Sequence, residues 1–272
     1  MGAPTTSRFV QVERHGDIVT LSLSHPAELN KLATDEQFLE LAEHIRRVNA
    51  DRSARALIIT GQGKAFCAGG DIHQMARKEG FSAGTPQDVR LKYKQAVHQV
   101  PLALYEADIP TIAAVNGAAY GAGCDLACMC DMRIASTNAT FCVSFAQLGI
   151  VSGDGGSWML PRLVGRSKAM EMTFTAEPVG AEEALKCGLV SRVVEPDQLL
   201  CEALALAEKI SRHPSEAVRM AKRLIRDAGH VSFASHLDMA AAFQAIAHAS
   251  PEHQAAVDAT VERLKNRRRV DG

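Results

Sequence analysis

The 272-residue chain lacks several features that mark particular classes of protein. Its 30 Lys and Arg nearly balance 31 Asp and Glu, so bulk charge gives no support for a general nucleic-acid or membrane-surface role. No apolar run approaches the length that spans a membrane, and the N-terminus has no stretch typical of a signal peptide. We therefore expect a cytoplasmic protein without nucleic-acid or membrane partners.

The chain also lacks a convincing metal motif. Its seven cysteines are an odd number, and without an export signal they are expected to stay reduced. Cys124, Cys128 and Cys130 stand close together, but zinc sites usually show two separated ligand pairs, and no second cluster follows. We interpret these three as small buried residues of a helix and expect no metal.

What is present is a hydrophobic pattern that predicts a layered α/β core. Residues 9–24 alternate apolar and polar side chains around a turn, which is typical of a β-hairpin. Residues 34–48 have the periodicity of an amphipathic helix that begins with a capping box. Buried strands are predicted over 54–60 and 110–115, each followed by a small-residue loop and a helix. The segment 81–90 is rich in turn formers and is expected to be a mobile surface loop.

After about Pro161 the strand pattern nearly vanishes and helical periodicity dominates. Helices are expected over 167–175, 181–187, 198–210, 215–227 and 236–248, and from Ser250-Pro251 towards Arg269. We therefore predict an α/β core over residues 1–195 and a helical C-terminal region over 196–272.

Two loops of small residues, AGGD (68–71) and GAGC (121–124), each lead into a predicted helix. Neither matches a phosphate-binding loop, a dinucleotide fingerprint or a nucleophile elbow. Amides in the first turn of a helix have no internal partner, and two that converge on one oxygen would form an oxyanion hole. From spacing alone another interpretation stays open, in which the glycines only permit tight turns and Asp71 only caps a helix.

These loops carry a resemblance to a known family. KAFCAGGDIHQM (64–75) resembles the first signature of the enoyl-CoA hydratase/isomerase (crotonase) family, and 109–136 resembles its second. The segment 141–194 continues the similarity, which extends to SPEHQAAVDA (250–259). The resemblance implies a crotonase-like α/β core of repeated ββα turns with a helical C-terminal trimerisation region, in homotrimers that pair into hexamers.

The resemblance also assigns roles to residues. Members of the family bind an acyl-CoA thioester whose carbonyl oxygen accepts two backbone amides, which fall here on Gly70 and Ala122. Loss of a proton from the acyl group gives an enolate, whose negative charge fixed amide dipoles stabilise. The path of the CoA moiety is expected along Ala68, Gly70, Asp71, Ile72 and His73. Coenzyme A is part of the substrate, and no separate cofactor is implied.

The acid–base residues depart from the pattern of the family's hydratases, which use two glutamates. The first falls at Asp125, one methylene shorter, and the second at Phe145, which cannot transfer a proton and is assigned to the pocket wall. The segment 145–166 resembles instead the isomerases of phenylacetyl-CoA breakdown, in which the aspartate of this loop is the base. That role carries to Asp154, and a mostly apolar pocket would make it a better base.

The leading prediction is therefore an enoyl-CoA isomerase or isomerase-like lyase in which Asp154 is the base. Three alternatives stay open: a 2-enoyl-CoA hydratase that uses Asp125 and Asp154, a CoA-ester-binding pseudoenzyme, and a hydrolase on the same fold. The basic residues Lys265 and Arg267–Arg269 either contact the CoA phosphates or form a solvated helix end.

Overall fold

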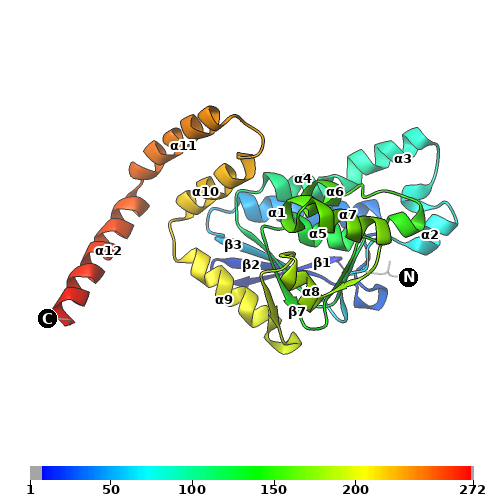
Figure 1. Cartoon of the computed structure of the whole chain (residues 1–272), viewed down its shortest axis with the longest axis horizontal. Helices are drawn as coiled ribbons and strands as arrows, with labels where there is room; N and C mark the ends of the chain where they lie inside the picture. Colours follow the sequence, from blue (N-terminus) through cyan, green and yellow to red (C-terminus); the bar gives the residue numbers. More distant parts are fainter. Residues whose placement is uncertain (1–7, 271–272) are drawn as a thin grey trace, which may run out of the picture.

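Two β-sheets form the core of the computed structural model, which describes the backbone of residues 8–270 and the side chains of residues 8–266 (Figure 1). The larger sheet has the strand order β1 (Val10–His15), β2 (Ile18–Leu23), β3 (Ala56–Gly61), β5 (Thr111–Val115), β7 (Met132–Ser136) and β10 (Arg192–Val194). The smaller sheet has the order β4 (Ala65–Cys67), β6 (Ala118–Tyr120), β8 (Thr140–Cys142) and β9 (Val179–Gly180). Except for the outer pairs β1–β2 and β8–β9, all neighbouring strands are parallel.

The core repeats a unit of two strands and a helix, which confirms the predicted α/β fold of ββα turns. The first strand of each unit joins the larger sheet and the second joins the smaller one, as in β3–β4 and β5–β6. The helices α2 (Ile72–Ala76) and α5 (Ala122–Met129) complete these two units. Because β4, β6 and β8 are parallel, the loops that follow them leave the smaller sheet at one edge.

Helices cover both faces of the larger sheet (Figure 1). On one face, α1 (Asp35–Ala50) and α4 (Gln99–Glu106) pack over the main apolar core. On the other face, Leu199, Ala203 and Ala207 of α9 (Leu199–Ser211) pack against buried isoleucines of β2, β3, β5 and β7. A strand covered on both faces is expected to be a continuous apolar run, and β5 is buried throughout its length.

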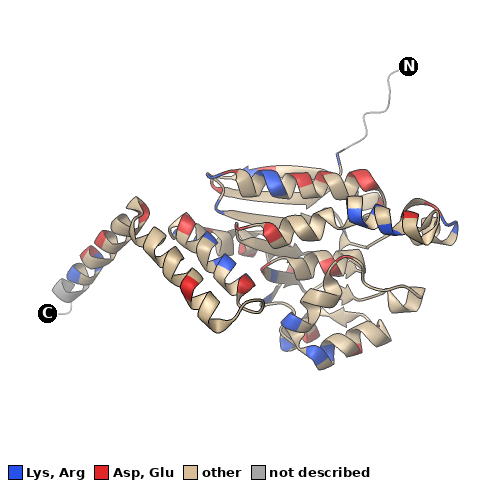
Figure 2. Cartoon of the chain, turned by 90° about the horizontal axis from the view of Figure 1, so that it is seen from above, with Lys and Arg blue, Asp and Glu red and all other residues tan. Residues whose placement is uncertain are grey.

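The remaining helices are α3 (Pro86–Lys92), α6 (Gly156–Val164), α7 (Arg166–Thr175), α8 (Ala181–Lys186), α10 (Ser215–Asp227), α11 (Phe233–His248) and α12 (Pro251–Val270). Short 3-10 turns occupy Pro26–Glu28, Gly80–Ser82, Ala146–Leu148 and Pro196–Gln198, and a π-helical turn occupies Tyr93–Val97. Figure 2 shows Lys and Arg interspersed with Asp and Glu along these helices, so the near-zero net charge does not hide a helix of a single sign.

Most of the predicted elements are confirmed. The hairpin forms as β1 and β2, and α1 begins with the predicted capping box, in which Thr34 and Gln37 exchange hydrogen bonds with each other's backbone amide. The expected loop over 81–90 is wrong, because its second half forms α3. Thr85 and Asp88 make a second capping box there, with Pro86 at the first helical position.

The last strand ends at Val194, and the described chain beyond it is helical apart from its short connections. The division at residue 195 stays a prediction, since α9 packs directly on the sheet of the core. The helices α11 and α12 project away from the sheets (Figures 1 and 2). Over the described part of the chain, every helix is too short or too polar to cross a membrane.

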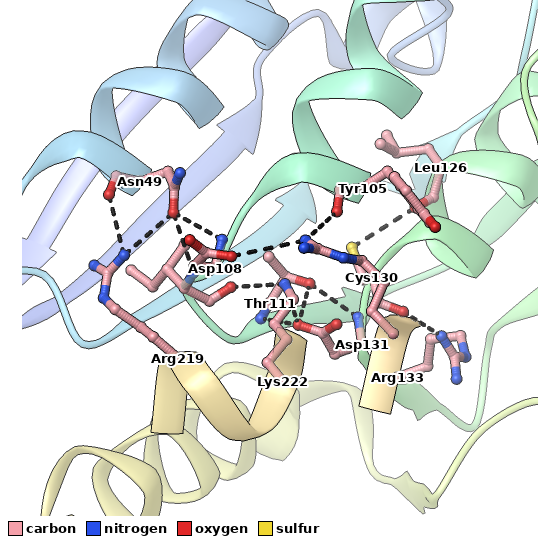
Figure 3. Close-up of polar contacts among 12 residues, drawn as sticks. Asn49, Tyr105, Asp108, Thr111, Leu126, Cys130, Asp131, Arg133, Arg219 and Lys222 are labelled. Carbon is pink, nitrogen blue, oxygen red and sulfur yellow. Dashed lines mark hydrogen bonds and ion pairs between the residues drawn. The ribbon is translucent and has the colours of Figure 1, made fainter. Parts of the chain in front are cut away.

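Three basic side chains attach α10 to the core (Figure 3). Arg219, only 6% exposed, donates to the Asn49 side chain at 3.2 Å and to the Ala54 carbonyl at 3.3 Å. Lys222 donates to the Ile109 carbonyl at 2.8 Å and pairs with Asp131 at 2.7 Å. The acceptors lie at the ends of core elements, so these bonds fix the helix across the edge of the larger sheet.

We expect Arg219→Ala to lower the free energy of unfolding by about 2 kcal/mol, because buried carbonyls would lose a charged donor. Arg223→Ala is the matched control on the same helix, since the Arg223 side chain is 51% exposed. Its expected effect is below about 0.5 kcal/mol. Urea unfolding of both variants would measure the difference, and equal midpoints would contradict the anchoring role.

Candidate active site

The two predicted small-residue loops lie against each other at the edge of the smaller sheet. Gly69 has φ +87°, and a Cβ there would lie 2.6 Å from the Tyr120 carbonyl oxygen and 3.5 Å from the Ala122 nitrogen. A Cβ at Gly123 would collide with the Cys67 carbonyl oxygen. The glycines are therefore required by the close approach of two backbones, and the entrances of α2 and α5 lie side by side.

Each of these loops carries an amide without an internal partner. Ala122 is the first residue of α5, and Gly70 precedes the cap of α2. Neither N–H donates to another residue of the described chain. Such amides can bind an oxygen that carries negative charge, so both predicted donors are available for that purpose.

Asp71 caps the short helix α2, as the alternative interpretation of this loop required. Its carboxylate accepts hydrogen bonds from the amides of His73 at 2.9 Å and Gln74 at 3.2 Å. The same carboxylate pairs with Lys31 at 2.7 Å, and this hydrogen bond holds the pKa of Asp71 below its ordinary value. Of the other residues expected along the CoA path, Ala68 is half-buried, and Ile72 and His73 are exposed.

A cavity of about 460 Å³ opens beside Gly70. Its lining is mostly apolar and includes Met75, Phe81, Val89, Tyr93, Leu148 and Ile150. Phe81 packs edge-to-face on Phe38 at 5.4 Å and approaches Tyr93 at 6.3 Å, so aromatic contacts fix one wall of the cavity. Part of that wall comes from the segment that was expected to be a mobile loop.

Asp154 is a buried carboxyl without a hydrogen-bond partner in the described part of the chain. It lies in the glycine-rich loop before α6 and is 8% exposed, and no described side chain or amide hydrogen-bonds to it. Burial raises the pKa of Asp154 from 3.8 to about 8, and the negative charge of Asp125 adds to that rise. A Cβ at Gly153 would lie 2.5 Å from the Tyr93 ring, so this loop also approaches the cavity wall.

Asp125, on the first turn of α5, faces the same loop. It is 2% exposed, and its Oδ2 accepts hydrogen bonds from the Ser152 hydroxyl at 2.6 Å and the Gly156 amide at 3.2 Å. Burial raises the pKa of Asp125 to about 6, against the opposing effect of these two hydrogen bonds. The structure therefore brings both predicted carboxylates to one loop, but in different surroundings.

Phe145 lies beside the start of α5. A Cβ at Gly121 would be 3.8 Å from its ring and 3.1 Å from the Ser144 hydroxyl. The buried ring places an apolar surface close to the loop that carries Ala122. Its assignment to the wall of the substrate pocket stays a prediction.

Residues 13–269 match the sequence model of a protein family that is described as "Enoyl-CoA hydratase/isomerase". The chain belongs to this family. It is therefore an enzyme of the hydratase/isomerase family, with acyl-CoA thioesters as its class of substrate.

Similar proteins include both types of enzyme in the family's name. The 1,2-epoxyphenylacetyl-CoA isomerase of Escherichia coli (strain K12) is 32% identical over 89% of this chain and 91% of that protein. The probable enoyl-CoA hydratase of Rhizobium meliloti (strain 1021) is 39% identical over 83% of this chain and 84% of that protein. An enoyl-CoA hydratase structure from Bacillus anthracis superimposes with a TM-score of 0.86 at 30% identity, covering 94% of this chain and 96% of that chain.

Sequence reasoning about this member of the hydratase/isomerase family missed two residues of the site. Ser152, which holds Asp125, lies 27 positions away in the chain, and no local pattern links the two. Tyr93 was not singled out because its helical surroundings were not predicted. The Thr85-Pro86-x-Asp88 capping box could have indicated the helix, and this helix leads directly to Tyr93.

Proposed function

We propose that the enzyme shifts the double bond of an enoyl-CoA thioester, with Asp154 as the base. The observation that carries this proposal is the buried, unpartnered Asp154 carboxyl, whose pKa is raised to about 8. A base is most effective when its pKa lies near the working pH. The similarity to the 1,2-epoxyphenylacetyl-CoA isomerase adds support, because that relative's name also describes an isomerase.

In the proposed reaction, the thioester carbonyl oxygen accepts the N–H groups of Gly70 and Ala122. The ionised Asp154 removes a proton from the carbon on one side of the double bond, and the electron pair moves towards the thioester oxygen. The two amides stabilise the resulting dienolate without having to reorient. Protonated Asp154 then returns the proton to a different carbon, so no atom is gained or lost.

A single carboxylate suffices for this reaction, whereas hydration needs two groups to hold and activate a water molecule. Phe145 stands where the resemblance places the second glutamate of a hydratase, and its ring cannot accept a proton. The Asp125 carboxylate is engaged by Ser152 and Gly156. Both observations favour the isomerase over the hydratase that would use Asp125 and Asp154.

An activity screen in deuterated water tests this proposal. With a panel of 3-enoyl-CoA esters, we expect conversion to the 2-enoyl isomers at least about tenfold faster than hydration of crotonyl-CoA. Deuterium should appear in those turnovers in which the proton on Asp154 exchanges with solvent before it is returned. Chromatography with mass detection separates the isomers, the hydrated product and the hydrolysis products. Faster hydration would favour the hydratase, and release of free acid or thiol would favour a hydrolase. Calorimetric binding without any deuterium exchange would favour a pseudoenzyme.

The predicted homotrimer or hexamer, the cytoplasmic location and the absence of a separate cofactor stay predictions. Exposed apolar side chains on the C-terminal helices, such as Ile225, Phe233 and Ile246, support a self-associating surface. Lys265 is exposed on α12, whereas the side chains of Arg267–Arg269 lie outside the described residues.

A further inference from the structure

The Asp125 carboxylate is directed at the backbone of the loop that carries Asp154. One oxygen accepts both the Ser152 hydroxyl and the Gly156 amide, one on each side of Asp154 in the sequence. The other oxygen packs so closely on Gly156 that a Cβ there would collide with it. At 2% exposure, this carboxylate has almost no surface left for a substrate or a water molecule.

The loop needs such a fastening because its own backbone is permissive. Gly153, Gly155 and Gly156 surround Asp154, and Gly155 has φ +98°. Ser152 extends the fastening, since its hydroxyl oxygen also accepts the Ser157 amide at 3.2 Å. Asp125, through Ser152 and Gly156, therefore joins both ends of a flexible segment to the rigid first turn of α5.

We propose that Asp125 is a positioning residue whose ionised carboxylate clamps residues 152–157 and repels negative charge from Asp154. The proposal rests on the proposed function, because it gives Asp125 its importance through the base. The two carboxylates then have different roles: Asp154 exchanges a proton with the substrate, and Asp125 does not.

The groups that face Asp154 are consistent with this role. Besides Asp125 on α5, they are Tyr93 from the π-helical turn and Cys67 at the end of β4, and the pKa values of both are raised mainly by burial. Neither a neutral phenol nor a neutral thiol supplies charge near pH 7. Asp125 is then the charged neighbour that distinguishes Asp154 from a carboxyl that is merely buried.

Two variants separate the charge of Asp125 from its clamp. Asp125→Asn keeps the shape and an oxygen for Ser152 and Gly156 but removes the charge. Ser152→Ala keeps the charge and removes one arm of the clamp. Carboxyl titration by NMR of protein labelled with 13C at the aspartate side chains follows Asp154 in the resting enzyme, and Asp154→Asn assigns its signal.

In wild-type protein the two coupled carboxyls are expected to titrate in two steps, the upper one near pH 8. Asp125→Asn should lower that upper step by about one pH unit or more, and move the acid limb of kcat/KM to lower pH by the same amount. Ser152→Ala should move the upper step less than Asp125→Asn does, because it keeps the Asp125 carboxyl group and removes only one of the two hydrogen bonds that lower its pKa. Its kcat should fall several-fold, about threefold to tenfold, with little change in KM.

An upper step that stays near pH 8 in Asp125→Asn would overturn the role of the charge, and wild-type kcat in Ser152→Ala would overturn the clamp. If Asp125→Asn does not fold, the Ser152→Ala kinetics still decide the second point. Failure of the proposed function appears differently, as normal turnover by Asp154→Asn. The NMR titration needs no turnover, so it distinguishes the two failures.

Discussion

Replacing Asp154 with Asn is expected to lower kcat for the double-bond shift by about a thousandfold, within the range of effects known for general bases. The amide has nearly the same volume as the carboxyl, so the loop and the cavity should be retained. Because the carboxylate acts only in proton transfer, KM should change by less than about threefold. Steady-state kinetics on a 3-enoyl-CoA ester, with deuterium exchange as a second readout, would measure both parameters.

The matched control is Asp197→Asn, which makes the same chemical change in the exposed turn Pro196–Gln198. It should leave kcat and KM as they are in the wild type. The pH dependence provides a further check, because Asp154 accepts a proton only when ionised, and wild-type kcat/KM should rise with pH up to about 8. The residual activity of Asp154→Asn should not show this rise with pH. Loss of less than about tenfold in kcat would contradict the assignment of Asp154 as the base.

Local patterns predicted those parts of the fold that local interactions determine. The β1–β2 hairpin and the capped start of α1 follow from periodicity and from residues three apart. The second strand of the first two repeats escaped prediction because β4 and β6 have three residues each, in stretches dominated by small side chains. Such strands are defined by their parallel partners, which lie elsewhere in the chain: Ala65 of β4 pairs with Ala118 of β6, and Ala118 pairs in turn with Thr140 of β8.

The candidate site likewise has features that the sequence predicted and features that depend on distant segments. The sequence and its family resemblance singled out both small-residue loops and both aspartates, and the structure brings the loops into contact. What the sequence could not show was the different surroundings of the two carboxyls. Asp125 accepts two hydrogen bonds and Asp154 accepts none from the described chain, and this difference depends on distant segments that meet only in the fold.

Asp154→Asn is also expected to stabilise the folded protein, by an amount that grows with pH. The folded-state pKa of about 8 exceeds the ordinary value of 3.8, so the wild-type carboxyl is easier to bury when protonated. The contribution of this raised pKa to the free energy of unfolding is fully present below about pH 4 and is lost as the pH rises through about 8. Asparagine does not titrate, so the variant should gain over the wild type across that window, reaching about 5 kcal/mol near pH 8.5.

Urea unfolding at pH 4.5, 6.5 and 8.5, at one protein concentration so that self-association does not enter the comparison, would measure this gain. Asp197→Asn should follow the wild type at every pH, because its carboxylate is solvated in both states. A stability difference between Asp154→Asn and the wild type that stays constant with pH would mean that Asp154 ionises normally in the folded protein. It would then lack the raised basicity that the proposed reaction needs. An increasing difference, together with the kinetic loss, would show that the enzyme holds its base at the expense of stability, as strained active sites commonly do.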